Sequence, residues 1–335
     1  MRPGRTRPCS DLSLAVLMAA LALAGCGNRQ SALLPRSEHA GEVFHLTLVM
    51  TLAGALILAL VTVLAGLGLL GGSGVRRRLA GRPLLVGGGI VFPVVALTLL
   101  LIWEIAILAR LDPPADDATL RVEVIGHQYW WEIRYLGPAG AHVTTANEVV
   151  LPAGGKVELA LRTADVLHSF WIPSLGGKMD LIPGRTNRLT LTTGDPVVLR
   201  GQCAEFCGEQ HALMAFDVEV LPPAGFAAWL ERQRSPAAAP ATPLLAEGRD
   251  AFLASGCGAC HTVRGTPAVG RLGPDLTHVG GRRTIAAGSF PTNVGTLAGW
   301  IADAQHLKRG NRMPSFGNLD GRTLRAIATW LGSLE

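Results

Sequence analysis

The chain contains the run Cys203-Ala-Glu-Phe-Cys207-Gly-Glu-Gln-His211-Ala-Leu-Met214, in which four metal-binding side chains follow one another closely. Cys203, Cys207 and His211 recur every four residues, and Met214 comes three residues later. A tight loop with this spacing can turn several donors toward one point. Thiolate, imidazole and thioether groups are soft donors that suit copper. The run therefore predicts a copper-binding loop.

A further donor has to come from another part of the chain, and His168 in Asp165-Val-Leu-His168-Ser-Phe-Trp171 is the candidate. A mononuclear blue copper site needs one cysteine, two histidines and a weak methionine. This chain offers two cysteines, and two thiolates can bridge two copper ions with one histidine on each ion. A zinc site and a Cys203–Cys207 disulfide are the alternatives. Zinc leaves Met214 unexplained, and a disulfide explains neither the histidine nor the methionine.

A second cluster, Cys257-Gly-Ala-Cys260-His261, has the spacing that attaches a c-type haem. The two thiols would add to the haem vinyl groups, and His261 would bind the iron. Met313 offers the second axial ligand, and a Met/His pair raises the haem potential. His278 and His306 are rival ligands that we expect to be surface histidines. A redox-active dithiol is the alternative, but it does not need the adjacent histidine.

Composition and charge divide the chain into unlike regions. Hydrophobic residues make up 49% and charged residues 16% of the 335 residues, and the apolar excess lies in the first third. Residues 112–222 contain eight Lys/Arg against 14 Asp/Glu, a net charge of −6, whereas residues 245–335 contain ten against six, a net charge of +4. Opposite charges should favour docking of the two regions. The basic residues form no aromatic-interleaved patch, so nucleic-acid binding is not expected.

Residues 1–25 predict a secretory signal peptide, because three arginines precede an apolar run from Leu12 to Ala24. The small residues before Cys26 resemble the cleavage box of bacterial lipoproteins, so Cys26 would become a lipidated first residue. A signal peptide or anchor with an incidental cysteine is the alternative. Export places both cysteine clusters in an oxidising compartment.

Residues 26–111 predict a transmembrane hairpin. Residues 43–70 and 84–109 are almost free of charged side chains, and a membrane span needs about 20 apolar residues. The loop between them carries Arg76, Arg77, Arg78 and Arg82, which the positive-inside rule places in the cytoplasm. Both chain ends then lie outside, in agreement with export. Buried helices of a soluble protein are the alternative.

The rest of the chain predicts two domains joined by a linker. Residues 112–222 predict an all-β sandwich or barrel, since short alternating or β-branched segments are separated by Pro and Gly. These segments are 120–125, 129–135, 156–161, 188–192, 197–201 and 215–220. Residues 223–243, rich in Pro and Ala, predict a semi-rigid linker. Residues 244–335 predict an all-α domain with helices near 244–255, 294–304 and 321–334.

Three stretches resemble subunit II of haem–copper cytochrome c oxidases: Gly126-His-Gln-Tyr-Trp-Trp-Glu132, Val166-Leu-His168-Ser-Phe170 and Cys203–Met214. The resemblance implies two transmembrane helices and a cupredoxin-like β-barrel that holds the binuclear copper centre CuA. The two cysteines would bridge the coppers, the two histidines would be terminal ligands, and a methionine and a backbone carbonyl would be weak axial donors. The implied ligands are His168, Cys203, Glu205, Cys207, His211 and Met214.

The same resemblance implies two further roles. The Glu205 carboxylate would reach a magnesium ion shared with subunit I. An aromatic run would lie beside CuA and receive electrons from cytochrome c; it consists of Tyr129, Trp130 and Trp131. The alternative is that these side chains only pack in the core of the barrel. Many members of the family have Trp where this chain has Tyr129. This departure puts docking of a free cytochrome in doubt, because the chain carries its own haem-binding segment.

Residues 244–335 resemble the small class I cytochromes c. Gly273-Pro274-Asp275-Leu276 matches their Gly-Pro-x-Leu turn, in which the proline carbonyl accepts a hydrogen bond from the proximal histidine. Carried over, Pro274 would orient His261, Cys257 and Cys260 would hold the haem, and Met313 would be the second axial ligand. A cytochrome c domain fused to a CuA domain is typical of subunit II of caa-type oxidases.

The caa-type resemblance implies that electrons pass from haem c through CuA to haem a of subunit I, where oxygen is reduced. The implied partners are oxidase subunits I and III, an upstream donor such as a cytochrome c or a quinol:cytochrome c reductase, and membrane lipid. The implied location is the bacterial plasma membrane, with both redox domains on the periplasmic side. A membrane-anchored electron carrier without an oxidase partner is the alternative. Residues 84–95 contain no carboxylate, so a proton-uptake role is not expected.

Overall fold

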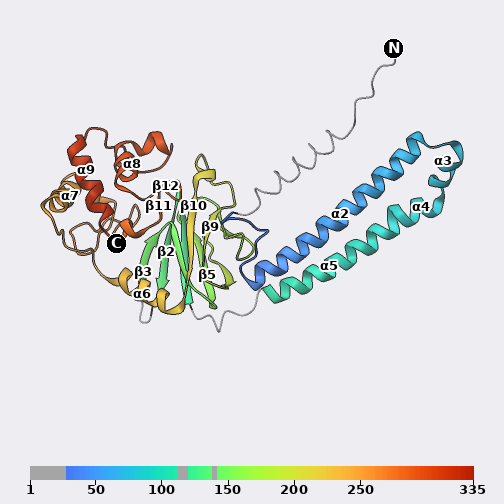
Figure 1. Ribbon diagram of the computed structural model, residues 1–335, viewed down its shortest axis with the longest axis horizontal. Helices are drawn as coiled ribbons and strands as arrows, with labels where there is room; N and C mark the ends of the chain where they lie inside the picture. Colours follow the sequence, from blue (N-terminus) through green and yellow to red (C-terminus); the bar gives the residue numbers. More distant parts are fainter. Residues whose placement is uncertain (1–27, 112–119, 138–141) are drawn as a thin grey trace, which may run out of the picture.

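The computed structural model describes residues 28–111, 120–137 and 142–335, which form three parts in a row (Figure 1). A long helical hairpin leads into a β domain, and a small helical domain lies on the side of the β domain away from the hairpin. The predicted signal peptide and the predicted lipidation site Cys26 lie outside the described residues.

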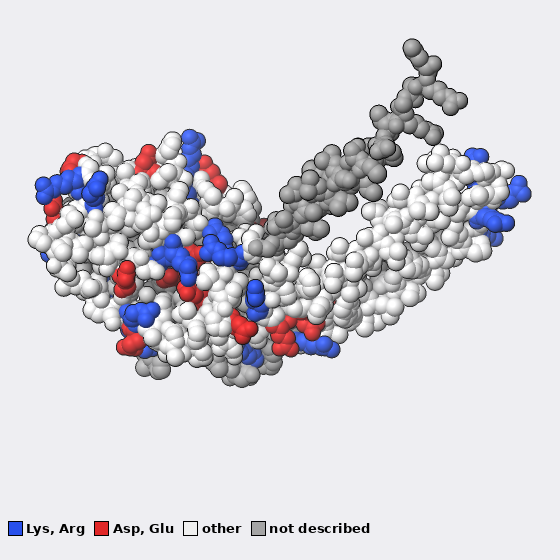
Figure 2. All heavy atoms as spheres, in the orientation of Figure 1, with Lys and Arg blue, Asp and Glu red and all other residues white. Residues whose placement is uncertain are grey.

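The hairpin consists of two long apolar limbs. The first limb is α2 (Glu38–Leu70), α3 (Ser73–Leu79) lies at the tip, and the second limb runs through α4 (Arg82–Val86), a π-helical turn (Gly87–Val91) and α5 (Phe92–Leu111). Both limbs are long and apolar enough to cross a membrane. In Figure 2 the hairpin surface is almost free of charge between its ends, and basic residues gather at the tip. So large an exposed apolar surface fits a lipid environment.

Residues 28–37 attach the hairpin to the β domain, and we call this segment the strap. The Arg36 N–H donates to the Ser174 carbonyl at 2.8 Å, and the Ser37 hydroxyl donates to the Leu175 carbonyl at 2.7 Å. In the other direction, the Ser174 hydroxyl donates to the Ser31 carbonyl at 2.9 Å. Ser37 is also the N-cap of α2, so one side chain both begins the helix and binds the β domain.

The β domain is built from two five-stranded sheets, which confirms the predicted all-β domain. One sheet has the strand order β3-β2-β1-β5-β8 and the other β4-β10-β9-β6-β7. Neighbouring strands are antiparallel except for the pairs β1–β5 and β4–β10. The strands are β1 (Leu120–His127), β2 (Trp130–Leu136), β3 (His142–Ala146), β4 (Glu148–Pro152), β5 (Lys156–Thr163), β6 (His168–Trp171), β7 (Met179–Leu181), β8 (Asn187–Thr192), β9 (Val197–Cys203) and β10 (Ala215–Leu221).

The two sheets enclose an aromatic core. Trp131 is fully buried, and its ring meets Phe170 and Phe216 edge-on at centroid distances of 5.6 and 5.4 Å. Phe170 and Phe216 stack on each other at 4.6 Å. Such pairs contribute about 0.5–1.5 kcal/mol each beyond the area they bury. Because Phe170 belongs to β6, which begins at His168, this core supports the strand that carries a predicted copper ligand.

The segment expected to be a linker begins with a helix instead. Helix α6 (Pro223–Arg234) packs on the β domain, where Trp229 meets Tyr135 edge-on at 5.1 Å and Phe226 lies 6.3 Å from the same ring. Burial of these aromatic side chains explains why the helix is held against the domain. The connection between the two domains is therefore shorter than predicted and runs from residue 235 to 242.

The C-terminal domain is helical, as predicted. It contains α7 (Pro243–Ala254), α8 (Val294–Leu307), α9 (Gly321–Gly332) and a small strand pair, β11 (Thr284–Ile285) and β12 (Phe290–Pro291). Helices α7 and α9 pack closely, and Phe252 meets Trp330 at 5.1 Å. Gly248 allows this approach, because a Cβ atom there would lie 2.1 Å from the Ala326 carbonyl oxygen.

The C-terminal domain meets the β domain through oppositely charged side chains, as the two net charges suggested. Each of three arginines of the C-terminal domain lies near a carboxylate of the β domain. The pairs are Arg282–Glu148 at 3.7 Å, Arg283–Glu219 at 3.2 Å and Arg312–Asp165 at 3.4 Å. Arg282 is buried at this interface.

Candidate copper and haem sites

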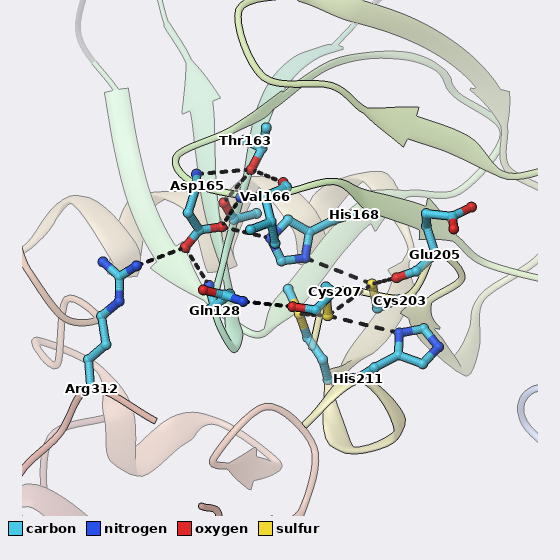
Figure 3. A network of polar contacts seen from close by, with 12 residues as sticks. Gln128, Thr163, Asp165, Val166, His168, Cys203, Glu205, Cys207, His211 and Arg312 are labelled. Atoms are coloured by element: carbon cyan, nitrogen blue, oxygen red, sulfur yellow. Dashed lines mark hydrogen bonds and ion pairs between the residues drawn. The ribbon is translucent and has the colours of Figure 1, made fainter. Parts of the chain in front are cut away.

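The five side chains predicted to bind copper converge in the β domain, and Figure 3 shows four of them, His168, Cys203, Cys207 and His211. The Sγ atoms of Cys203 and Cys207 lie 3.8 Å apart. Nδ1 of His168 lies 3.9 Å from Cys203 Sγ, and Nδ1 of His211 lies 3.9 Å from Cys207 Sγ. The Met214 Sδ atom is 3.8 Å from Cys207 Sγ. Each thiol therefore has its own imidazole, and His211 is the only one of the five that is not fully buried.

The strand pairing brings these donors together from two parts of the chain. Cys203 is the last residue of β9, which pairs with β6, and β6 begins at His168. The loop between β9 and β10 is closed by a hydrogen bond from the Cys203 N–H to the Met214 carbonyl at 2.9 Å. Gly126 makes room for the imidazole, since a Cβ atom there would lie 2.8 Å from the His168 ring.

Asp165 fixes the orientation of His168. Its carboxylate accepts a hydrogen bond from His168 Nε2 at 2.9 Å and from the backbone N–H groups of Gln128 and Val166 at 2.8 Å each. Burial raises the pKa of Asp165, but these hydrogen bonds outweigh burial and lower the pKa to about 2. The ionised carboxylate keeps the proton on Nε2 and leaves Nδ1 free to bind a metal.

The two thiols differ in acidity. The hydrogen bond between the two thiols, helped by contacts with His168 and the backbone, lowers the pKa of Cys203 against the effect of burial. The same contact, together with burial, raises the pKa of Cys207. Cys203 is therefore the more acidic of the two thiols. Because the thiolate is the form that binds metals, binding of a metal would release the protons that the two thiols still hold.

The donor set fits copper better than either alternative. A sulfur–sulfur distance of 3.8 Å is far longer than the roughly 2.05 Å of a disulfide, and both cysteines are free. A tetrahedral zinc site would be complete with two thiolates and two imidazoles. Met214 is nevertheless fully buried beside Cys207, and a thioether is a copper ligand rather than a zinc ligand.

The second cysteine cluster fits a haem. Cys257 and Cys260 are free and only half buried. His261 Nδ1 donates a hydrogen bond to the Pro274 carbonyl at 2.8 Å, which leaves Nε2 available to an iron. Gly273 lies against the imidazole, and a Cβ atom there would be 2.6 Å from His261 Cε1. The position of the His261 ring therefore requires a glycine at residue 273.

Met313 is held in the loop after α8 by two hydrogen bonds. The Gln305 amide donates to the Met313 carbonyl at 2.6 Å, and the Asn311 side chain accepts from the Met313 N–H at 2.8 Å. The Met313 side chain packs against the core of the C-terminal domain. These contacts fix the loop, and the role of Met313 as an axial ligand stays a prediction.

The two rival histidines have different environments. His306 is exposed, as predicted. The prediction for His278 is wrong, because this residue is buried, with its two ring nitrogens 2.9 Å and 3.1 Å from the carbonyl oxygens of Glu335 and Ser235. His278 therefore joins the C-terminus to the inter-domain connection, and both of its nitrogens are occupied.

Comparison with known proteins decides the family. The model of "Cytochrome C oxidase subunit II, periplasmic domain" matches residues 137–221, and that of "Cytochrome c" matches residues 245–335. The chain is 30% identical to cytochrome c oxidase subunit 2 of Bacillus subtilis over 97% of both proteins. The chain belongs to the cytochrome c oxidase subunit II family. The two domains that follow the helical hairpin are accordingly a cupredoxin-like copper domain and a cytochrome c domain.

Two further comparisons are partial. The chain is 39% identical to cytochrome c oxidase subunit 2 of Alkalihalophilus pseudofirmus, over 67% of this chain and 64% of that protein. A solved structure, the periplasmic domain of subunit II of cytochrome oxidase from Bradyrhizobium japonicum, is 28% identical with a TM-score of 0.34. It covers 36% of this chain and 97% of that domain.

The aromatic run of this subunit II chain spreads over three environments. Trp131 lies in the core, with its ring 5.9 Å from that of His168. The Tyr129 hydroxyl accepts a hydrogen bond from the Glu209 N–H at 3.1 Å. Trp130 stacks on His127 at 4.3 Å and lines a cavity of about 440 Å³ between the copper and cytochrome domains. A role of these residues in electron uptake stays a prediction.

Glu205 presents two groups in different directions (Figure 3). Its backbone carbonyl lies 3.2 Å from Cys203 Sγ. Its carboxylate is 41% exposed and lies 3.5 Å from the Lys178 ammonium. The predicted magnesium site of subunit II stays a prediction, because the other ligands would have to come from a second subunit.

Sequence reasoning missed two residues that lie next to the predicted copper ligands of this subunit II. Asp165 could have been found, since it lies three residues before a predicted metal ligand and carboxylates commonly orient such histidines. Lys308 could not have been found, because it reaches the copper domain from the cytochrome domain, 95 residues beyond its acceptor at Leu213.

Proposed function

We propose that this chain receives electrons in its cytochrome domain and passes them through its copper domain to the oxygen-reducing subunit of a haem–copper oxidase. One observation carries the proposal. Arg312, the residue before Met313, reaches Asp165, and Asp165 holds His168. The two donor sets are therefore connected through one peptide bond and two consecutive contacts. Membership of the subunit II family favours an oxidase over a free-standing electron carrier.

We propose that the copper domain holds a binuclear centre. Cys203 and Cys207 would bridge two ions, which is supported by their 3.8 Å separation and by the separate imidazole beside each thiol. One weak donor lies near each sulfur, the Glu205 carbonyl near Cys203 and Met214 near Cys207. When bound, two coppers that share one charge would take up and release an electron with little change in bond lengths. The buried side chains would keep water from the centre.

We propose that Cys257 and Cys260 hold a haem c covalently and that His261 and Met313 are its axial ligands. When bound, such a haem carries one electron, and its Met/His ligation raises its potential. Pro274 would keep the proton on Nδ1 of His261, and Gly273 would leave space for the ring.

The proposed surroundings follow from the same assignment. The exposed Glu205 carboxylate would complete a magnesium site with subunit I. The other proposed partners are subunit III, an upstream donor (a cytochrome c or a quinol:cytochrome c reductase) and the lipid around the hairpin. The basic tip at Arg76–Arg78 supports a location in the bacterial plasma membrane with both redox domains on the periplasmic side.

The proposal is tested by metal analysis and spectroscopy of the full, matured chain. We expect two coppers per iron, a mixed-valence copper signal in electron paramagnetic resonance, and a low-spin haem with methionine ligation. Cys207→Ser should abolish the copper signal and leave the haem spectrum unchanged. The native chain should also co-purify with a large polytopic haem-bearing subunit. Fewer than two coppers per iron would contradict the binuclear assignment, and isolation without such a subunit would contradict the oxidase assignment.

A further inference from the structure

One lysine of the cytochrome domain is buried where this domain contacts the copper domain. Lys308 follows α8 and is 2% exposed. Its ammonium donates hydrogen bonds to the carbonyl oxygens of Leu213 at 2.8 Å, Ala286 at 3.0 Å and Tyr129 at 3.2 Å. Leu213 and Tyr129 belong to the copper domain, and Ala286 belongs to the cytochrome domain. Lysine is almost never fully buried unless its charge is compensated.

The three acceptors match the chemistry of an ammonium group. A lysine ammonium has three donors and no acceptor, and each of its three hydrogens finds one carbonyl oxygen here. No carboxylate takes part, so this contact differs from the arginine–carboxylate pairs elsewhere in the interface. Because the acceptors are backbone oxygens at fixed positions in two domains, the contact specifies one relative position rather than a general attraction.

The chain on either side of Lys308 fits the copper domain closely. Gly310 has a φ of +70° and lies against Glu209, where a Cβ atom would be 3.0 Å from the carboxylate. The neighbouring loop of the cytochrome domain makes a backbone contact as well, from the Ala215 N–H to the Ala287 carbonyl at 3.0 Å. Ala286 and Ala287 both have positive φ, a conformation that non-glycine residues adopt only when their surroundings hold them there.

This contact lies on the copper domain next to the metal ligands. Leu213 immediately precedes Met214, and Glu209, on which Gly310 rests, donates to the Tyr129 hydroxyl. Tyr129 is buried and has the cytochrome domain of the same chain as its neighbour, whereas the Leu213 side chain remains 44% exposed.

We infer that Lys308 is a positioning residue that locks the cytochrome domain against the Tyr129 and Leu213 backbone, and that this lock keeps the two donor sets in one relative position for electron transfer between the domains. The inference rests on the proposed function. The transfer that the lock positions moves one electron from the cytochrome domain to the copper domain, and it breaks no bond.

The test compares Lys308→Met with Arg309→Met in the full chain loaded with haem and copper. Methionine keeps much of the lysine stem but has no donor, and Arg309 is the adjacent, exposed cation. A reduced soluble cytochrome c is mixed with each oxidised protein in a stopped-flow spectrometer. In the wild type and in Arg309→Met, haem reduction should come first and copper reduction should follow at a rate independent of donor concentration.

In Lys308→Met, we expect this second step to slow at least tenfold, because the cytochrome domain would no longer keep one position on the copper domain. Hydrogen exchange of the peptide that contains Ala215 should accelerate in Lys308→Met but not in Arg309→Met. Lys308→Met kinetics and exchange equal to those of Arg309→Met would overturn the lock. Failure of copper reduction in the wild type would instead overturn the proposed function, so the two failures are distinguishable.

A second variant tests the same inference independently, in case Lys308→Met misfolds. Gly310→Asp keeps Lys308, tolerates the positive φ better than most residues, and places a carboxylate against that of Glu209. Copper content and the haem spectrum should remain those of the wild type, while the second reduction step slows and Ala215 exchange accelerates. If Gly310→Asp leaves both unchanged, the inference is wrong.

Discussion

The copper domain and the cytochrome domain differ in how much of their structure the polypeptide supplies by itself. The copper domain has one cluster of 25 buried hydrophobic residues, against which eight partly buried ones pack. The cytochrome domain has a cluster of 12, with 14 partly buried residues around it. Among those 14 are Cys257 and Met313, two of the residues expected at the haem. The copper ligands Cys203, Cys207 and Met214 belong instead to the fully buried set.

The two cofactors would therefore contribute differently to the folding of their domains. In the copper domain, packing of two sheets positions the ligands, and a metal would bind to a site that is already folded. The cytochrome domain is small, and a domain of this size buries too little apolar surface to be very stable by itself. A covalently attached haem would be part of its core.

Loss of both haem-attaching thiols should have the largest effect. In Cys257→Ser/Cys260→Ser we expect the cytochrome domain to lose its helical structure, because its core would lack the group around which it packs. The copper domain should stay folded. Limited proteolysis should then remove residues 244–335 and leave the copper domain intact. A protease-resistant cytochrome domain in this variant would refute the view that the haem completes its core.

Removal of copper should have a smaller effect on the other domain. After treatment with a chelator, we expect the copper domain to retain its β-sheet circular dichroism and a cooperative unfolding transition. Loss of a ligand that was present at about 1,000 times its dissociation constant costs about 4 kcal/mol of stability, which lowers the melting temperature without unfolding the domain. A copper-free domain with no cooperative transition would contradict the view that the copper site is folded before the metal binds.

Gly273→Ala should disturb the haem site without unfolding the domain. The added methyl group would lie 2.6 Å from His261 Cε1, and the ring would have to move. Such overpacking typically costs about 1–3 kcal/mol. The haem midpoint potential and the methionine-ligation band should change. Gly281→Ala is the matched control, because its Cβ atom would meet Glu335 at an ordinary 3.6 Å, and it should leave both signals unchanged.

Asp165→Asn should weaken the copper site through His168. The amide cannot hold the His168 proton as a carboxylate does, and loss of such a partner typically reduces metal affinity about 10–100-fold. Copper competition titrations measure this change. Arg312→Gln separates the two roles of Asp165, because it removes only the ion pair between the domains. Equal copper affinities in the two variants would show that the contact with His168 is unimportant.

The exposed ion pairs between the domains should have the smallest effect. Arg283 and Arg312 have largely exposed side chains, and such pairs contribute about 0.2–1 kcal/mol and are screened by salt. Arg283→Gln should therefore lower the rate of transfer between the domains only slightly. In the wild type, the rate should fall modestly as ionic strength rises. A rate that is flat from low to high ionic strength would argue against electrostatic docking.

The sequence was most informative where donors lie close together along the chain. The spacing of Cys203, Cys207, His211 and Met214 predicted a site that the strands do assemble. Six strands were also recognised by alternation. Four were not, because β6 and β7 have only four and three residues, and β3 and β4 are separated only by Asn147 with a φ of 59°. Such short segments carry too little periodicity to be recognised.

Contacts between distant segments could not be predicted. Helix α6 was taken for a linker, since its apolar residues gain a partner only when Tyr135 packs on them. His278 was expected at the surface, since nothing local indicates that the C-terminus would fold over it. Lys308 looks like an ordinary surface lysine until two domains meet. Each of these errors concerns a residue whose environment is set by tertiary contacts rather than by its neighbours in the chain.

The strap has a consequence for the geometry of the assembled membrane complex. A domain attached only at the end of α5 could tilt over the bilayer, and the height of its metal ligands above the lipid would vary. Residues 31–37 add a second attachment at Ser174 and Leu175. Two attachments define an axis and remove most of this freedom. Electron tunnelling weakens steeply with separation. A fixed height above the lipid would therefore keep the distance from the metal ligands to the next electron acceptor constant, because the domain would not tilt.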